Sequence, residues 1–213
     1  MSPQPIPFQA IIRETLVPFQ TTFAILDRVP PAKHGLDVLI EVHKAILSQQ
    51  HPYWGQLREG PGVVRFGGRV VYRAPPPQEA RALADEAMQW MGQQKASKSM
   101  DPKILAAEIM QRLVRAHVFK DGNGRASRAV GAWVLCRSGY YLILDPRLYC
   151  KLNVDRYYRA LGAPAVELTK APSGAWHDYC GGMFLECFKR SLLGTAPYPN
   201  PASRNQTGIH YDA

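Results

Sequence analysis

The stretch His117-Val-Phe-Lys-Asp-Gly-Asn-Gly-Arg-Ala-Ser-Arg128 indicates both the helical fold of this chain and its chemistry. Its glycines open a helix, and the free N–H groups and dipole of a helix start bind anions. Arg125 and Arg128 lie three residues apart, so one helix face presents both guanidinium groups to phosphate oxygens. Asp121 offers Mg²⁺ a hard carboxylate oxygen. His117 can accept a proton from an attacking hydroxyl. The stretch therefore predicts a site for magnesium triphosphate between two helices.

Other interpretations of this stretch fit less well. A calcium-binding loop that began at Asp121 would need glycine and glutamate where the chain has Ala126 and Ala132. A dinucleotide-binding G-x-G-x-x-G would need a preceding strand, and glycine in place of Ser127. The simplest remaining alternative is an Asp-Gly turn between two helices with arginines on a solvated face. The coincidence of all these residue types at these spacings favours the phosphate site.

The pattern on either side of the stretch predicts an all-α domain of six to eight helices with a protruding β-hairpin at about residues 63–73. Two β-rich runs flank Gly67-Gly68, which is typical of a two-residue hairpin turn. Gly92 is predicted to close a helix, and a Lys/Ser-rich loop is expected at 93–100. Helical spacing of apolar residues or helix-capping signals predict helices at about 15–26, 36–47, 80–91, 101–117, 125–138, 154–161 and 176–192.

Length and composition indicate a single globular domain. The chain has 213 residues, of which 46% are hydrophobic and 20% charged, and this is enough to bury a substantial core. No apolar run approaches the roughly 18 to 20 residues of a membrane helix. The first residues lack the basic and apolar segments of a secretory signal. We therefore expect a cytoplasmic protein, with delivery into another cell by a signal-independent route left open.

Cysteine spacing and charge exclude further site classes. Cys136, Cys150, Cys180 and Cys187 form no Cys-x-x-Cys pair, so we expect buried free thiols rather than a zinc site. The net charge is +9, but the basic residues are scattered. A solvated basic surface with a nucleotide-phosphate pocket accounts for this charge, and we do not expect nucleic-acid binding.

The stretch at 117–128 matches the H-x-F-x-[DE]-G-N-G-R-x-x-R signature of the Fic (filamentation induced by cAMP) family, and the chain resembles this family from about Leu36 to Leu192. The resemblance implies the Fic fold with its hairpin flap. It also implies transfer of AMP from MgATP to a Tyr, Thr or Ser hydroxyl of a target protein, with release of pyrophosphate. Residues 1–35 are expected to form an N-terminal extension, 36–193 the catalytic domain, and 194–213 a weakly ordered tail.

The resemblance also implies a role for each residue of the motif. His117 would be the general base and Asp121 the Mg²⁺ ligand. Arg125 would contact the β-phosphate, and Arg128 would place the terminal phosphate. The residues implied to hold the α- and β-phosphates are Gly122, Asn123 and Gly124.

Two pairs outside the motif are weaker candidates. The hairpin resembles the flap that aligns a target segment as an added strand, and the exposed edge of a hairpin suits this task. Val70 and Val71 either clamp the target residue or the base, or pack onto the body of the domain. Tyr157 and Tyr158 either line the nucleoside pocket or belong to the core.

A self-inhibitory [ST]-x-x-x-E-[GN] motif, present in many Fic proteins, is not recognisable. Only Glu59 is followed by glycine or asparagine, and Gly55 stands where serine or threonine is required. The activity is then constitutive, restrained by a separate antitoxin-like protein, or blocked by another device. Transfer from UTP or another nucleotide remains an alternative, as do a non-catalytic Fic-like binding protein and a basic nucleic-acid-binding module.

Overall fold

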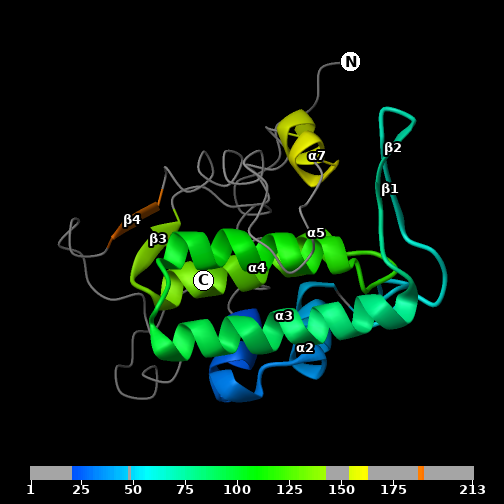
Figure 1. Cartoon of the computed structure of the whole chain (residues 1–213). Coiled ribbons are helices and arrows are strands. Elements are labelled where there is room, and N and C mark those ends of the chain that lie inside the picture. The colour runs from blue at the N-terminus through cyan, green and yellow to red at the C-terminus, as the bar shows by residue number, and fades with distance from the viewer. Residues whose placement is uncertain (1–20, 48, 143–153, 163–186, 190–213) are drawn as a thin grey trace, which may run out of the picture.

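The computed structural model describes residues 21–47, 49–142, 154–162 and 187–189, and it confirms a mostly helical fold with one projecting hairpin (Figure 1). Three long helices pack side by side, with a further helix against them. Residues 21–28 are also helical. The helices and the short 3₁₀ element are η1 (Pro31–Lys33), α2 (Leu36–Ile46), α3 (Pro77–Ser97), α4 (Pro102–Ala116), α5 (Asn123–Arg137) and α7 (Val154–Gly162).

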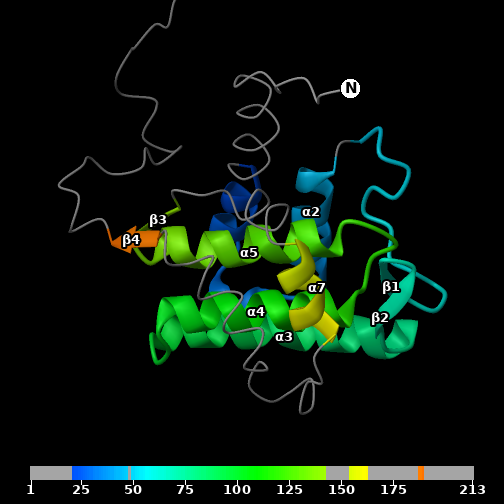
Figure 2. The same cartoon turned by 90° about the horizontal axis from the view of Figure 1, so that it is seen from above.

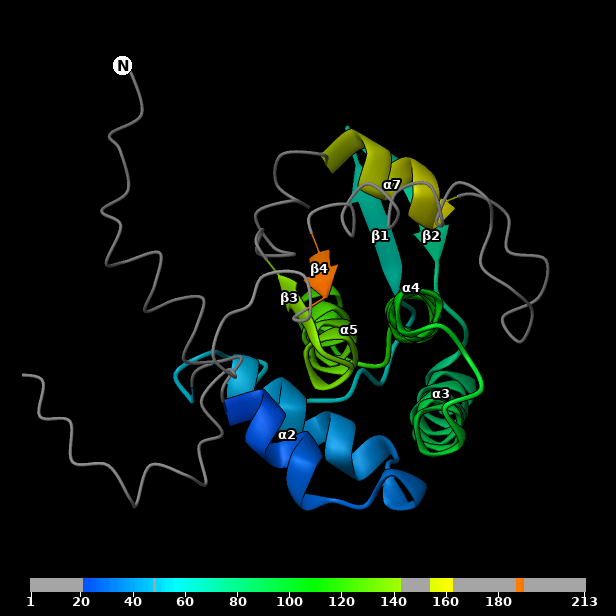
Figure 3. The same cartoon turned by 90° about the vertical axis from the view of Figure 1, so that its left-hand side faces the viewer.

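Helix α5 is the centre of the fold, as its apolar sequence predicts. It packs against both α4 and α2, and the end-on view in Figure 3 shows it between them. Residues on all its faces are buried. A Cβ atom at Gly131 would lie 2.6 Å from Met110 Sδ, so glycine allows α4 and α5 to approach closely. Helix α4 begins where predicted, since Asp101 caps it by accepting a hydrogen bond from the Lys103 N–H at 2.8 Å.

The segment before α2 packs into the same core. Phe23 and Leu26 are buried in it, and Asp27 accepts a hydrogen bond of 2.9 Å from the Trp133 indole N–H. The prediction that Gly92 ends a helix is wrong, because α3 continues to Ser97. A Cβ at Gly92 would lie 1.9 Å from the carbonyl oxygen of Pro31 in η1. Gly92 therefore lies inside the helix because only a residue without a side chain leaves room for the neighbouring main chain.

The hairpin consists of β1 (Val63–Phe66) and β2 (Arg69–Arg73), which confirms the predicted flap. A shift in register between Val64 and Arg65 leaves Val71 as an additional residue in β2. The hairpin rises at the end of the helices where α4 leads into α5, and α7 lies above that end (Figure 2).

The last helix prediction, at 176–192, is wrong in its described part. Residues 187–189 form strand β4 (Cys187–Lys189), which pairs antiparallel with β3 (Tyr140–Leu142). Residues 15–20 of the first predicted helix, the tail at 194–213, Cys150 and Cys180 lie outside the described residues. No helix in the described part of the chain combines the length and the apolar character that crossing a membrane would require.

Candidate active site

The loop between α4 and α5 contains the polar residues of the motif and is shaped by two left-handed positions. His117 ends α4 with φ 50° and ψ 48°, and Gly122 precedes α5 with φ 82°. Asn123 is buried and spans the loop: its Oδ1 accepts from the Phe119 N–H at 2.9 Å, and its Nδ2 donates to the Phe119 carbonyl at 2.8 Å. These two bonds fix the conformation of the loop between Phe119 and Asn123.

A second segment, residues 51–58, runs alongside the motif loop and supports it. The Arg58 N–H donates to the Val118 carbonyl at 2.9 Å, and the Lys120 N–H donates to the Gln56 carbonyl at 3.2 Å. Between these bonds, Leu57 and Phe119 form an antiparallel bridge. The motif loop is therefore anchored by main-chain hydrogen bonds to a segment about 60 residues earlier.

Arg58 is the most connected side chain of this segment. It is buried, with 5% of its surface exposed. Its guanidinium donates to the carbonyl of His117 at 2.6 Å, of Gly60 at 2.8 Å, and of Pro75. One side chain thus joins the residue predicted as the base to both ends of the flap. Sequence reasoning missed Arg58, because a single arginine in a loop resembles a surface charge.

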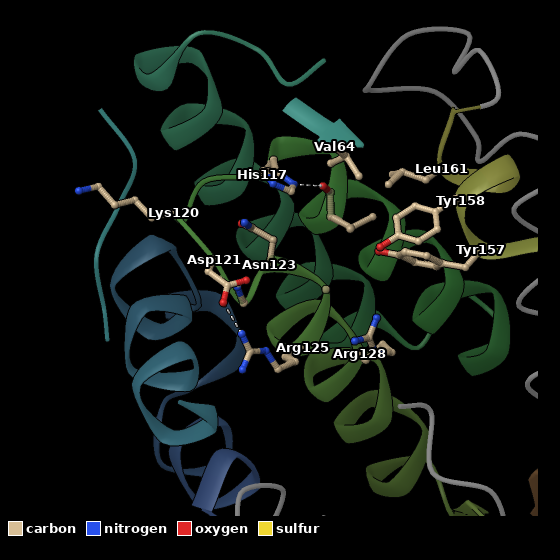
Figure 4. A pocket seen from close by; sticks show the side chains of 13 residues that line it. Val64, His117, Lys120, Asp121, Asn123, Arg125, Arg128, Tyr157, Tyr158 and Leu161 are labelled. Atoms are coloured by element: carbon tan, nitrogen blue, oxygen red, sulfur yellow. Dashed lines mark hydrogen bonds and ion pairs between the residues drawn. The ribbon is translucent and has the colours of Figure 1, made fainter. Parts of the chain in front are cut away.

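The His117 imidazole is oriented with one nitrogen available. Its Nδ1 lies 3.2 Å from the Val114 carbonyl oxygen, which can only accept, so Nδ1 carries the proton and Nε2 keeps a lone pair (Figure 4). Burial lowers the pKa of His117, against the opposing effect of this hydrogen bond. The ring is therefore neutral at neutral pH, as a general base has to be.

Asp121 is an ionised carboxylate at the edge of the site. Its Oδ1 accepts from the Gly122 N–H and its Oδ2 from Arg125, both at 2.6 Å. Burial by itself raises the pKa of Asp121, but the Gly122 hydrogen bond and the Arg125 charge outweigh it, so the pKa is lowered. Half of the side-chain surface is exposed.

This carboxylate fits Mg²⁺, which proteins often bind through one or two carboxylates together with substrate phosphates. In the described part of the chain no group of three or more His, Cys, Asp or Glu side chains forms a metal cluster.

Gly124 allows Arg128 and Tyr157 to meet above the first turn of α5. A Cβ there would lie 3.0 Å from an Arg128 terminal nitrogen and 3.3 Å from the Tyr157 hydroxyl. The Arg128 guanidinium lies 5.9 Å from the centre of the Tyr157 ring. Tyr158 contacts Tyr157 edge-on, with 5.1 Å between ring centres, and stacks on Phe66 of the flap at 4.5 Å. The two tyrosines therefore link the first turn of α5 to the flap.

These side chains line one open pocket of about 250 Å³ (Figure 4). Helices α4, α5 and α7, the motif loop and strand β1 form its walls. Its lining residues are Val64, Val114, His117, Lys120, Asp121, Gly122, Asn123, Gly124, Arg125, Arg128, Tyr157, Tyr158 and Leu161.

The pocket brings together every motif position expected from the sequence, and also Tyr157 and Tyr158. Tyr157 is buried, whereas Tyr158 is half-buried. Val70 and Val71 do not line the pocket, and Val64 does. The register explains the difference: Val64 pairs with Tyr72, on the face that contacts α4, whereas Val70 pairs with the exposed Arg65.

Comparison with known proteins gives a family match and a shared fold. The model of the Fic/DOC family matches residues 34–135. A protein named "Protein adenylyltransferase Fic" from Drosophila ananassae is 32% identical to this chain over 124 residues, which are 58% of this chain and 23% of that protein. The match thus spans about a quarter of the length of that relative.

Solved structures share the fold at low sequence identity. A Fic domain-containing signaling protein from Bacteroides thetaiotaomicron superposes with a TM-score of 0.61 and 20% identity, covering 84% of this chain and 66% of that one. The BepC protein from Bartonella tribocorum, a VirB-translocated effector solved with bound AMPPNP, superposes with a TM-score of 0.54 and 14% identity. That superposition covers 86% of this chain and 89% of BepC.

Proposed function

Residues 34–135 form a Fic/DOC domain, and on this premise we propose that the chain is a protein adenylyltransferase. It would transfer AMP from MgATP to a Tyr, Thr or Ser hydroxyl of a target protein. The observation that carries this proposal is the orientation of His117: a neutral imidazole presents a bare Nε2 in the same pocket as an ionised carboxylate and two arginines. This set supplies a base and charge stabilisation in one place.

The proposed reaction proceeds in one displacement. The target hydroxyl oxygen forms a bond to the α-phosphorus of ATP, its proton passes to His117 Nε2, and the bond from the α-phosphorus to the bridging oxygen breaks. Pyrophosphate leaves with that oxygen. Asp121, together with the phosphates, would hold Mg²⁺, and the bound ion would neutralise charge at the phosphate oxygens. Arg125 binds the β-phosphate and Arg128 the terminal one, so both stabilise the charge that builds on the leaving group.

The positions of the lining residues support binding of the ATP phosphates at one end of the pocket and of the nucleoside at the other. Arg125 and Arg128 project from the first two turns of α5, near the positive end of its dipole. The tyrosines come from α7, where a ring can stack on a nucleobase. BepC, which shares the fold, was solved with bound AMPPNP, an ATP analogue. We propose that ATP binds this chain with its phosphates at α5 and its nucleoside toward Tyr157 and Tyr158.

The flap provides the acceptor side of the proposal. Within the described residues its two strands pair only with each other, and we propose that an extended target segment adds to their edge as a third strand. Val64, in strand β1 of that hairpin, lines the pocket. We propose that a target protein presents its hydroxyl across this wall to His117.

The test is intact-mass analysis of the purified chain, alone and with added candidate target proteins, after incubation with MgATP. Transfer predicts a gain of one AMP on the target or on the chain itself, and no gain with His117→Ala. Circular dichroism of the variant establishes that it is folded. A mass gain with UTP but not with ATP would show that the donor is UTP and that UMP is transferred. No gain from any nucleotide would contradict the enzymatic function and leave a binding role.

A further inference from the structure

His43, in α2, contacts the motif loop from below and has a single hydrogen-bonding arrangement. The Gly55 N–H donates to its Nδ1 at 3.2 Å, so Nδ1 is the acceptor and Nε2 carries the proton. Nε2 then donates to the Asp121 carbonyl oxygen at 2.8 Å. The ring is fully buried and stacks on Phe119, with 3.8 Å between ring centres. His43 therefore fixes the main chain of Asp121.

Glycine at position 122 is required by the same contact. A Cβ atom there would lie 2.8 Å from His43 Nε2 and 3.2 Å from Leu47 Cδ1. The loop can therefore rest on His43 only because the residue after Asp121 has no side chain. This close approach is independent of the hydrogen bonds and points to the same fit between α2 and the loop.

His51 makes a similar contact with the side chain of Asp121. The Tyr53 N–H donates to its Nδ1 at 3.2 Å, so Nδ1 is the acceptor and Nε2 is the ring nitrogen that carries a proton. Nε2 lies 3.3 Å from Asp121 Oδ2, so the imidazole and the carboxylate are in contact. A protonated Nε2 has no lone pair for a metal, so this arrangement makes His51 a partner of the carboxylate and not a second metal ligand.

From these contacts we propose that His43 and His51 are positioning residues that hold Asp121 for the metal: His43 through its carbonyl, His51 through its carboxylate. The inference rests on the proposed function for the metal role of Asp121. In that function Arg125, which now contacts Asp121 Oδ2, is needed at the phosphate. The His51 contact keeps the carboxylate oriented once Arg125 has moved to the nucleotide. Substitution of a residue that hydrogen-bonds to a metal ligand typically lowers the metal affinity 10- to 100-fold.

The experiment is Mn²⁺ binding, followed by electron paramagnetic resonance, with Mn²⁺ as the probe for Mg²⁺ and AMPPNP as the nucleotide. His51→Leu should weaken Mn²⁺ binding to the AMPPNP complex by about tenfold. His51→Gln keeps an N–H donor at the end of the side chain and should recover most of the affinity. AMPPNP binding in the presence of a metal chelator should be the same in the native chain and in both variants.

His34→Leu is the matched control for the general effect of losing a histidine. His34 is more buried than His51, and its Nε2 contacts the main-chain carbonyls of Leu26 and Val29; it packs beside Trp133, away from the motif loop. The control should lower the melting temperature and leave Mn²⁺ affinity unchanged. An equal loss of Mn²⁺ affinity in the control, unchanged affinity in His51→Leu, or equal weakening of AMPPNP with and without metal would overturn the proposal.

Asp121→Asn separates the failure of this inference from the failure of the proposed function. It should abolish the tight Mn²⁺ signal, and retention of that signal would remove the metal role of Asp121 and the inference with it. Because the measurement needs no transfer, a native chain whose Mn²⁺ binding requires Asp121 and is strengthened by His51, but which transfers no AMP, would refute the proposed function alone.

Discussion

The pocket has two walls that are held in different ways. The motif wall, residues 117–128, is anchored by buried groups far away in the sequence: Arg58, His43 and the main chain of residues 56–58. The flap wall, residues 63–73, projects from the helices and has half-exposed or exposed side chains along both strands. Catalytic groups need a fixed geometry, whereas a surface that receives a protein segment does not. Substitutions in the motif wall should therefore slow transfer to every target, whereas substitutions in the flap should mainly change which target is modified.

The largest effect is expected from His117→Ala in the motif wall. Loss of the base should reduce transfer by about 10²- to 10⁴-fold. Because His117 is only half-buried and ends its helix, the fold should persist. Single-turnover kinetics with ATP measure the rate, and thermal melting measures the stability. If the variant transferred AMP within a factor of about two of the native rate, His117 would not be the general base.

Arg58→Met tests the junction between the walls and should have the next largest effect. The substitution leaves three part-buried carbonyl groups, of His117, Gly60 and Pro75, without this donor. The free energy of unfolding should fall by about 2–4 kcal/mol, as measured by urea denaturation. Arg58→Lys retains the charge without the three-way fork and should recover only part of this loss. If Arg58→Met left the unfolding free energy unchanged, the two walls would be independent.

The pH dependence of transfer tests the electrostatics of the motif wall. Burial lowers the pKa of His117 below the ordinary 6.5. The neutral, active ring therefore persists through neutral pH, and the rate should fall only as the pH drops through a value below 6.5. A profile of kcat/KM against pH in constant ionic strength measures this limb. A midpoint above 6.5 would show that the base is not held in the environment described.

The smallest effect is expected from Tyr72→Phe in the flap. The Tyr72 hydroxyl donates to the Arg115 carbonyl at 2.7 Å, and its ring packs under the Arg115 guanidinium. Removing one hydrogen bond should cost about 1 kcal/mol of unfolding free energy. ATP affinity, measured by calorimetry, should not change, whereas transfer to a protein target should decline. A loss of ATP affinity as large as that of transfer would mean that the flap also shapes the nucleotide site.

The two walls also differ in what the sequence alone predicts. The motif wall is local: a twelve-residue pattern sets the loop and the first turn of α5, so its polar residues were predictable. The hairpin was predictable from Gly67-Gly68 between two β-rich runs. Its register was not, because the shift at Val64 and Arg65 depends on packing against α4 and α7, and it places Val64 in the pocket in place of Val70 and Val71.

Contacts between distant segments account for most of what was missed. Arg58 and His43 reach the motif loop across 59 and 78 residues of sequence, and no local pattern reports such a pairing. Glycine at position 92 is typical of a helix end. In the structure, however, glycine is needed there because the main chain of Pro31 packs against it. Strand β4 forms where a helix was predicted, because residues 187–189 pair with β3. In each case a tertiary contact overrides the local preference.

The most direct test of the central claim is the leaving group, identified by ³¹P NMR when the chain and a protein acceptor are incubated with MgATP. Attack at the α-phosphorus in this pocket predicts pyrophosphate together with AMP bound in a phosphodiester, and neither product with His117→Ala. Formation of ADP with a phosphorylated acceptor, or of free orthophosphate and ADP, would place the reaction at the γ-phosphorus and contradict the account.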